Sequence, residues 1–223
     1  MTIADKILEF YSKLEPPTGL PADVVVMNPY RNTEAWRVTE EFYRRFYNDE
    51  KERVVLFGIN PGRFGGGITG IPFTDPIHLE SVCKIINPFN KRAELSSRFI
   101  YEMIEAFGGP ENFYRKFFIS AISPLGFIQN EKNLNYYDIE NWKELFEEYV
   151  VKKIKEQLAF PLNRKVAYSI GQGQNLKYLS ALNKKYQFFE RIETVPHPRW
   201  VMQYRLKRKE EFINQYVQTL DPS

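Results

Sequence analysis

The sequence predicts an α/β fold: a three-layer α/β/α arrangement around one central, mainly parallel, four-stranded sheet. Two observations support this prediction. Short apolar runs rich in β-branched residues alternate with stretches of helical periodicity, and strands separated by helices pair in parallel through right-handed crossovers. No repeat or shift in composition divides the chain, so we expect a single domain over residues 1–223.

The elements follow from local patterns taken in chain order. Apolar residues near helical spacing indicate amphipathic helices, and Asn32 or Thr33 caps the second of them. The expected helices are 2–14, 34–46, 78–85, 95–107, 139–158, 174–182 and 206–220. The four sheet strands are expected at 53–59, 117–122, 166–170 and 190–195, with a further short strand at 24–27 and a polar loop at 130–137.

Composition limits the chemistry available to the chain. It has 223 residues, one cysteine and two histidines, which excludes an internal disulfide framework and a four-cysteine zinc or iron–sulfur site. We therefore expect no metal and no cofactor. The sequence has no apolar stretch of about 18 residues and no signal-peptide pattern at its start, so no membrane partner and a cytoplasmic location are expected.

Charge is unevenly distributed along the chain. The net charge is only +3, but residues 184–209 hold eight basic and two acidic residues, a local charge of +6. Such a segment indicates a surface that binds a polyanion. The alternative is that these charges lie on ordinary solvated faces. Aromatic residues make up 16% of the chain, and they either fill the core or stack on bases.

Three strand ends carry a polar residue beside glycine or proline: Asn60, Ser123 and His197. Because parallel strands place their carboxyl ends on one edge of a sheet, we expect these residues to converge. An asparagine amide can hold a water molecule, and a histidine can stabilise a leaving anion near neutral pH. No nucleophile elbow and no cysteine–histidine pair is present, so amide hydrolysis is disfavoured.

Glycines 65, 67 and 70 match a dinucleotide-binding pattern only by spacing. The pattern begins six residues after the predicted strand and leads into Ile71-Pro72 instead of a helix. A dinucleotide fingerprint needs a strand before it and a helix N-terminus after it. The glycine-rich loop either permits close backbone approach to some other ligand or is a long hairpin or crossover connection without chemistry.

The segments 58–65 and 69–73, which read GINPGRFG and TGIPF, resemble motif one of the single-strand-selective monofunctional (SMUG-like) branch of the uracil-DNA glycosylase superfamily. Asn28-Pro29-Tyr30 resembles the entry segment of that branch, and His197-Pro198 resembles the start of its second motif. The resemblance covers about residues 25–215. It implies the uracil-DNA-glycosylase fold and a monofunctional enzyme that hydrolyses the N-glycosidic bond of a flipped-out deaminated base in base excision repair.

The resemblance also implies residue roles. Asn60 would position the attacking water, His197 would stabilise the departing base and Phe73 would stack on it. The implied base pocket comprises Gly58, Ile59, Gly62, Arg63, Phe64, Gly70, Phe73, Ser120 and Ser123. The implied DNA contacts are Arg199, Trp200, Met202, Arg205, Lys207 and Arg208. The wedge candidates are the four residues 199–202, Arg199, Trp200, Val201 and Met202. DNA would be the partner, and the protein would act as a monomer.

Two departures from the family pattern affect specificity and rate. The asparagine that reads uracil in this branch falls on Ala121, so xanthine and hypoxanthine are also expected substrates. No carboxylate follows Gly58-Ile59, so water activation is expected to be weak. Two alternatives remain at this point: a damaged-DNA-binding protein of the same fold without catalysis, and a nucleoside or nucleotide hydrolase.

Overall fold

The computed structural model describes residues 1–221 and contains the predicted parallel sheet. Strands β2 (Arg53–Gly58), β3 (Phe117–Ala121), β6 (Leu162–Ile170) and β7 (Arg191–Val195) pair in the order β3-β2-β6-β7, and every pairing is parallel. The four strands were predicted at these places in the sequence, and the α/β fold class is confirmed. Strand β6 begins four residues earlier than the apolar run indicated. Residues 163–165 are polar and at least partly exposed, so they do not extend the apolar pattern.

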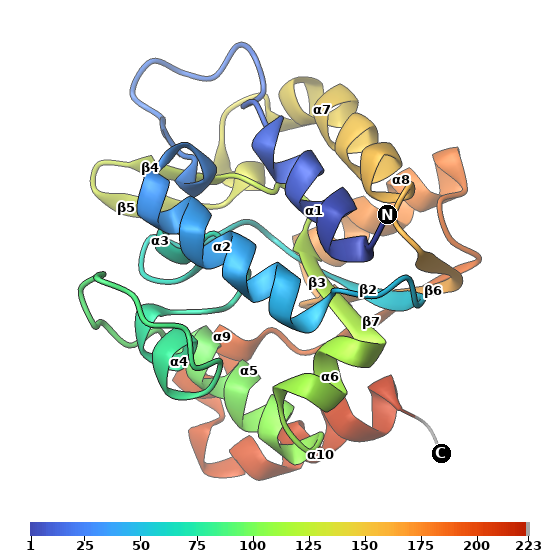
Figure 1. Ribbon diagram of the computed structural model, residues 1–223. Helices are drawn as coiled ribbons and strands as arrows, with labels where there is room; N and C mark the ends of the chain where they lie inside the picture. The colour runs from blue at the N-terminus through green and yellow to red at the C-terminus, as the bar shows by residue number, and fades with distance from the viewer. Residues whose placement is uncertain (222–223) are drawn as a thin grey trace.

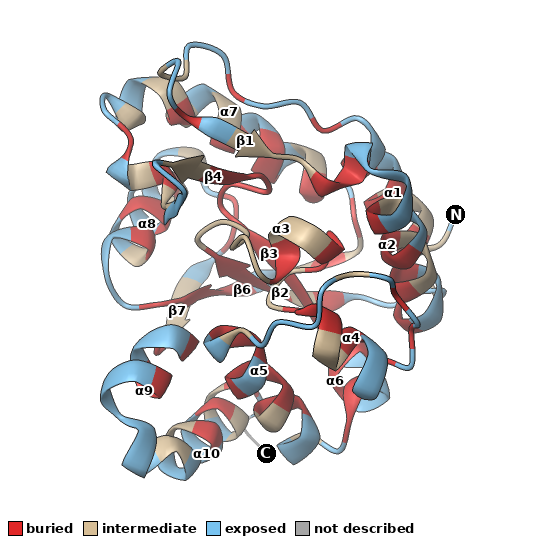
Figure 2. Ribbon diagram, turned by 90° about the vertical axis from the view of Figure 1, so that its left-hand side faces the viewer, coloured by how far each residue is buried: buried red, intermediate tan, exposed pale blue. Residues whose placement is uncertain are grey.

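Helices cover both faces of this sheet (Figures 1 and 2). One layer contains α1 (Ile3–Ser12), α2 (Thr33–Phe46), α7 (Trp142–Gln157) and α8 (Gln174–Tyr186). The other contains α5 (Leu95–Ala106), α6 (Pro110–Lys116), α9 (Pro198–Tyr204) and α10 (Lys209–Leu220). Since both faces are covered, strand β3 is buried along its whole length and reads as a continuous apolar run.

A second, three-stranded sheet was not predicted. It consists of β1 (Val25–Met27), β4 (Gly126–Gln129) and β5 (Lys132–Leu134), which pair in antiparallel fashion in the order β1-β4-β5. The prediction of a plain loop over 130–137 was therefore wrong. Asn130 and Glu131 form the hairpin turn with φ of 49° and 58°. Glutamate is not typical of such a turn, so the sequence carried little hairpin signal.

Several short helices also interrupt segments that were expected to be loop or single helix. The glycine-rich loop contains α3 (Gly66–Thr69), and α4 (Pro76–Ser81) is shorter than the predicted helix 78–85. The 3₁₀ turns η1 (Pro29–Arg31), η2 (Tyr136–Asp138) and η3 (Leu206–Arg208) complete the chain. Proline opens α6 and α9 at their first helical position, where its missing N–H costs nothing. No helix within residues 1–221 is long and apolar enough to cross a membrane.

Candidate active site

A cavity of about 290 Å³ opens at the carboxyl edge of the parallel sheet. Strand β2 leads into one wall through Asn60, β3 supplies the floor through Ser120 and Ala121, and the end of β7 supplies His197. The cavity brings together Asn60 and His197, which are 137 positions apart in the sequence, as predicted from their strand ends. Its lining comprises Gly58, Ile59, Asn60, Pro61, Gly62, Gly66, Pro72, Phe73, Glu94, Ser96, Ser120, Ala121, Asn133, Asn135, His197, Arg199, Trp200, Gln203 and Tyr204.

The side-chain amide of Asn60 is held by the backbone at the end of β5 and at the start of η2. Its Oδ1 accepts a hydrogen bond from the Tyr136 N–H at 3.0 Å, and its Nδ2 donates to the Leu134 carbonyl at 3.2 Å. These two bonds fix the orientation of the amide plane. One lone pair of Oδ1 remains free, so the oxygen can still accept a hydrogen bond from a water molecule.

Phe73 packs over the end of β2 in a conformation that few residues adopt. Its φ is 53°, and its ring lies where a Cβ at Gly58 would stand, only 2.8 Å from Cε2. Glycine at position 58 therefore makes room for the ring. Residues held in the left-handed region cost free energy and tend to occur at functional sites. The ring centroid lies 6.1 Å from that of His197, so the two rings form adjoining parts of the cavity wall.

His197 is the N-cap of α9 and is held as a neutral imidazole. Its Nδ1 accepts a hydrogen bond from the Arg199 N–H at 3.1 Å, which places the ring proton on Nε2. Burial, assisted by the charge of Arg199, lowers the pKa of His197 to about 4. The ring is therefore an uncharged hydrogen-bond donor at neutral pH, with Nε2–H free of any protein acceptor among residues 1–221.

The floor of the cavity offers little side-chain polarity. Ser120 lines it, but its hydroxyl donates to Gln157 Oε1 at 2.5 Å on the far side of the strand. Ala121 presents only a methyl group. The predicted pocket residue Ser123 lies outside the lining, because its buried hydroxyl donates to the Leu125 carbonyl at 2.9 Å and stabilises the turn after β3.

Three predicted pocket residues of the glycine-rich loop also lie outside the cavity lining. The Arg63 guanidinium donates to the Glu131 carbonyl, and the guanidinium groups of Arg63 and Arg92 both lie over the Phe64 ring. Gly70 is buried, and its carbonyl accepts a hydrogen bond from the Tyr30 hydroxyl at 3.0 Å. These residues shape the loop, whereas Gly62 and Gly66 line the cavity.

A carboxyl group absent from the predicted site occupies the space beside these glycines. A Cβ at Gly65 would stand 2.0 Å from Glu94 Oε2, and one at Gly62 would stand 2.7 Å from Oε1. Burial and the negative charge of Asp75 raise the pKa of Glu94 to about 7, while the charge of Arg199 opposes the shift. Glu94 lies 34 positions after Asn60 in a segment without a motif, so no sequence pattern indicated it.

Helix α9 forms the rim of the cavity. Its contribution to the cavity lining consists of Arg199, Trp200, Gln203 and Tyr204. Trp200 is 40% exposed and Tyr204 is 65% exposed. Met202, predicted as a wedge residue, is 5% exposed and packs into the core with Val201. Helical periodicity explains this difference, since positions 201 and 202 face inward and positions 199, 200, 203 and 204 face outward.

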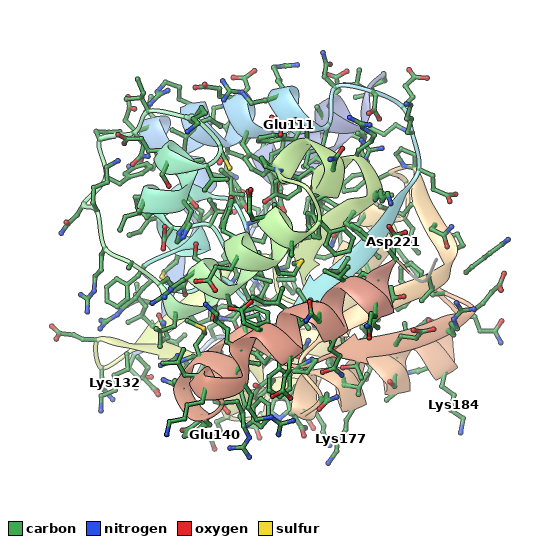
Figure 3. All side chains as sticks on the ribbon, turned by 90° about the horizontal axis from the view of Figure 1, so that it is seen from below. Glu111, Lys132, Glu140, Lys177, Lys184 and Asp221 are labelled. Carbon is green, nitrogen blue, oxygen red and sulfur yellow. The ribbon has the colours of Figure 1, made fainter. Side chains whose placement is uncertain are left out.

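The basic segment 184–209 does not form one surface. Strand β7 carries the chain across the sheet, so Arg191 lies at the amino end of β7 and Arg199 lies beyond its carboxyl end. Figure 3 shows Lys184 projecting at the side of the molecule opposite to Lys132 of β5. Arg205, Lys207 and Arg208 are exposed beside the rim, where Arg205 stacks on Trp200 and Arg208 pairs with Glu211.

The described residues, 1–221, contain no group of three or more histidine, cysteine, aspartate or glutamate side chains arranged to hold a metal ion. Asp75, close to the glycine-rich loop in sequence, is the N-cap of α4. Its Oδ1 accepts from the His78 N–H at 2.8 Å. Although burial opposes ionisation, hydrogen bonds from His78 and from the Glu94 N–H lower the pKa of Asp75.

Comparison with known proteins identifies the family. Residues 45–221 match the uracil DNA glycosylase superfamily over most of the chain. The chain belongs to this superfamily. The crystal structure of wild-type SMUG2 from Pedobacter heparinus is similar over 98% of this chain and 97% of that chain, with 42% sequence identity and a TM-score of 0.95. The resemblance to the SMUG-like branch is thereby confirmed.

Within this uracil DNA glycosylase fold, sequence reasoning missed the cavity residues that lie outside the two motifs. Asn133 comes from the unpredicted β4–β5 hairpin, Asn135 follows β5 as the N-cap of η2, and Glu94 and Ser96 come from the start of α5. Gln203 and Tyr204 follow the second motif by one and a half turns of helix. Only the outward spacing of 199, 200, 203 and 204 could have indicated the last two from the sequence.

Proposed function

We propose that the protein is a monofunctional DNA glycosylase that releases deaminated bases, uracil and also xanthine or hypoxanthine, during base excision repair. The observation that carries this proposal is the convergence of Asn60, Phe73 and His197 on one cavity at the carboxyl edge of the sheet. Membership of the uracil DNA glycosylase superfamily supports the reaction class. The cytoplasmic location and the monomeric state stay predictions.

In the proposed reaction the damaged nucleotide leaves the base stack, at a cost of a few kcal/mol, and its base enters the cavity. The Phe73 ring supplies a face on which the base stacks. The bond between C1′ and the base nitrogen breaks, and its electron pair departs with the base. Water adds its hydroxyl to C1′, and the base takes up the remaining proton.

The geometry of the two polar residues suits this division of work. Asn60 Oδ1, fixed by the Tyr136 N–H, can hold the water. His197 donates a hydrogen bond through Nε2–H to the oxygen of the departing base. Because the ring is neutral, it acts as a hydrogen-bond donor and not as a proton-transferring acid. Preorganised donors of this kind contribute most where charge develops in the transition state.

DNA would approach across the rim formed by α9. Trp200 and Tyr204 present exposed aromatic surface beside the cavity, and Arg205 and Lys207 present positive charge next to them. Aromatic side chains can fill the gap left by an extruded base, and basic side chains neutralise phosphates. In this arrangement Trp200, one of the expected wedge residues, acts together with Tyr204, whereas the expected wedge residues Val201 and Met202 are buried.

The test is base release from oligonucleotides that carry one uracil, hypoxanthine or xanthine, detected by alkaline cleavage of the abasic strand. Wild-type protein should release at least one of these bases, and Asn60→Ala and His197→Ala should not. Asn214→Ala, at an exposed position of α10, serves as the matched control and should behave as wild type. Near-full release by both active-site variants would contradict the proposal.

The same assay separates the two alternatives. A binding protein without catalysis would retain damaged oligonucleotides in a salt-dependent manner and leave every base attached. A nucleoside hydrolase would act on free nucleosides and gain nothing from polymeric DNA.

A further inference from the structure

Glu94 places a carboxyl group in the cavity that no protein group satisfies. It precedes α5 as the N-cap residue, yet its side chain makes no capping bond. Among residues 1–221 no hydrogen bond or ion pair engages its oxygens, although they lie beside Gly62 and Gly65. The carboxyl group is therefore available to a ligand.

Several other polar atoms of the lining are already engaged. Asn60 binds the backbone of Leu134 in β5 and of Tyr136, Asn133 Oδ1 accepts from the Arg63 N–H, and Asn135 Nδ2 donates to Asp138. The Ser120 hydroxyl points to Gln157. Glu94 and His197 each offer an unpaired polar atom to a base inside the cavity, and Glu94 offers a whole carboxyl group.

The backbone of Glu94 is held in place by the buried side chain of Asp75. The Glu94 N–H donates to Asp75 Oδ2 at 2.9 Å, and Asp75 is itself fully buried and caps α4. In front, the absence of side chains at Gly62 and Gly65 leaves the room that the carboxyl group fills. A group held in this way loses little rotational freedom when it binds a ligand.

The raised pKa, about 7, means that much of the Glu94 population is the neutral acid at neutral pH. A neutral carboxylic acid presents one O–H donor beside one carbonyl acceptor, as an amide presents N–H and C=O. Uracil, xanthine and hypoxanthine share a ring N–H beside a carbonyl group. An acid can pair with that edge through two hydrogen bonds, donating to the carbonyl and accepting from the N–H.

We propose that Glu94 is the specificity-determining residue of the cavity and hydrogen bonds to the N–H and carbonyl edge of the extruded base. It would replace the base-reading asparagine that is absent at Ala121. This inference rests on the proposed glycosylase function and assigns to that function the group that recognises deaminated bases.

The experiment compares wild type with Glu94→Gln, Glu94→Leu and a control, Glu105→Gln, at an exposed position of the same helix α5. Glutamine keeps one donor and one acceptor, whereas leucine keeps the approximate volume and removes both. Single-turnover release of uracil and hypoxanthine should stay within a few-fold of wild type in Glu94→Gln and fall about 10- to 100-fold in Glu94→Leu. Affinity for an undamaged oligonucleotide and the melting temperature should change little in either variant.

A pH profile supplies a readout that a merely structural role would not move. Uracil and hypoxanthine keep their ring N–H protons between pH 6 and pH 8, so the profile reports on the protein. Release by wild type should fall as pH rises through about 7, when Glu94 ionises, and Glu94→Gln should show no such fall. The charged or titratable groups facing Glu94 are Asp75 and Arg199, with His197 in the same cavity. Burial lowers the pKa of His197 to about 4, and, although burial opposes this, hydrogen bonds from His78 and the Glu94 N–H lower the pKa of Asp75, so neither group accounts for a fall in release near pH 7.

Two results would overturn the inference. One is full base release by Glu94→Leu. The other is an equal loss of base release in Glu94→Leu and Glu94→Gln, together with a pH profile of Glu94→Gln that is the same as that of wild type. Failure of the proposed function gives a different pattern. In that case the wild type releases no base at any pH, and the Glu94 variants cannot differ from it.

Discussion

The ends of β2 and β7 each deliver one polar side chain to the cavity, and the two side chains are held in different ways. The Asn60 amide is bound on both sides by backbone groups of residues 134 and 136. His197 is bound only at Nδ1, by the second residue of its own helix, and Nε2–H has no protein partner among residues 1–221.

This difference indicates a division of labour. An amide that is tied to a distant segment acts as a rigid holder, and its loss should disturb both the fold and the reaction. An imidazole that is tied only locally acts as an available donor, and its loss should disturb mainly the reaction. The following variants test that contrast, from the largest expected effect to the smallest.

Asn60→Ala should have the largest combined effect. Without a group that positions water, base release should fall about 10²- to 10⁴-fold. The variant also leaves the Tyr136 N–H and the Leu134 carbonyl without their partner, so the free energy of unfolding should fall by about 1–3 kcal/mol. Single-turnover release and urea denaturation measure the two effects. A variant as stable as wild type would show that the amide does not tie η2 to β2.

His197→Ala should reduce base release about 10²- to 10³-fold, because one preorganised donor is lost. The free energy of unfolding should fall by only about 1 kcal/mol, the typical loss for one N-cap bond. The same two assays apply. If this variant is destabilised more than Asn60→Ala, the contrast between the two strand ends is wrong.

Gly58→Ala tests the wall that joins the two strand ends. The added Cβ would stand 2.8 Å from Phe73 Cε2, so the ring must move away from the base-stacking position. We expect base release to fall roughly tenfold and stability to fall by about 1–3 kcal/mol, as overpacking does. A Phe73→Leu variant provides the comparison. Combining the two substitutions should relieve the clash and recover part of the stability.

Acid should reduce the contribution of His197, at the end of β7, to the free energy of unfolding. The pKa of His197 is lowered to about 4 in the folded chain, below the value of 6.5 expected when unfolded. Its neutral form therefore contributes stability that is fully present above about pH 6.5 and is lost as pH falls toward 4. The difference in unfolding free energy between wild type and His197→Gln should shrink over that window. A difference that is constant with pH would contradict the lowered pKa.

The smallest effect is expected from charge beside the rim. Arg205→Ala combined with Lys207→Ala should weaken DNA binding a few-fold at moderate salt. The slope of log K against log salt should become shallower by about 0.7–0.9 for each lost phosphate contact. Lys184→Ala, which Figure 3 places at a distant side of the molecule, is the matched control and should leave the slope unchanged. An equal effect of Lys184→Ala would indicate that residues 184–209 bind DNA as one basic surface, as the sequence suggested.

The sequence by itself determined the parallel sheet, its four strands and the residues at the strand ends. Buried parallel strands read as short apolar runs, and a strand end beside glycine or proline marks where side chains meet. Asn60 and His197 could be singled out for this reason, whereas Phe73 was implied by the resemblance of segments 58–65 and 69–73 to the family motif. These signals are local, so they survive without knowledge of the three-dimensional structure.

Only the tertiary structure decided which other side chains reach the cavity. Glu94 enters it because two glycines leave space beside it. Asn133 enters it from a hairpin whose turn has an atypical sequence, and Asn135 enters it directly after that hairpin. Met202 leaves it because helical phase turns the side chain inward. Packing decides how much space lies between segments that are far apart in the chain. It also decides which face of a short helix points toward the core. A single sequence records neither, so the base-reading group was visible only once the loop, α5 and α9 were placed together.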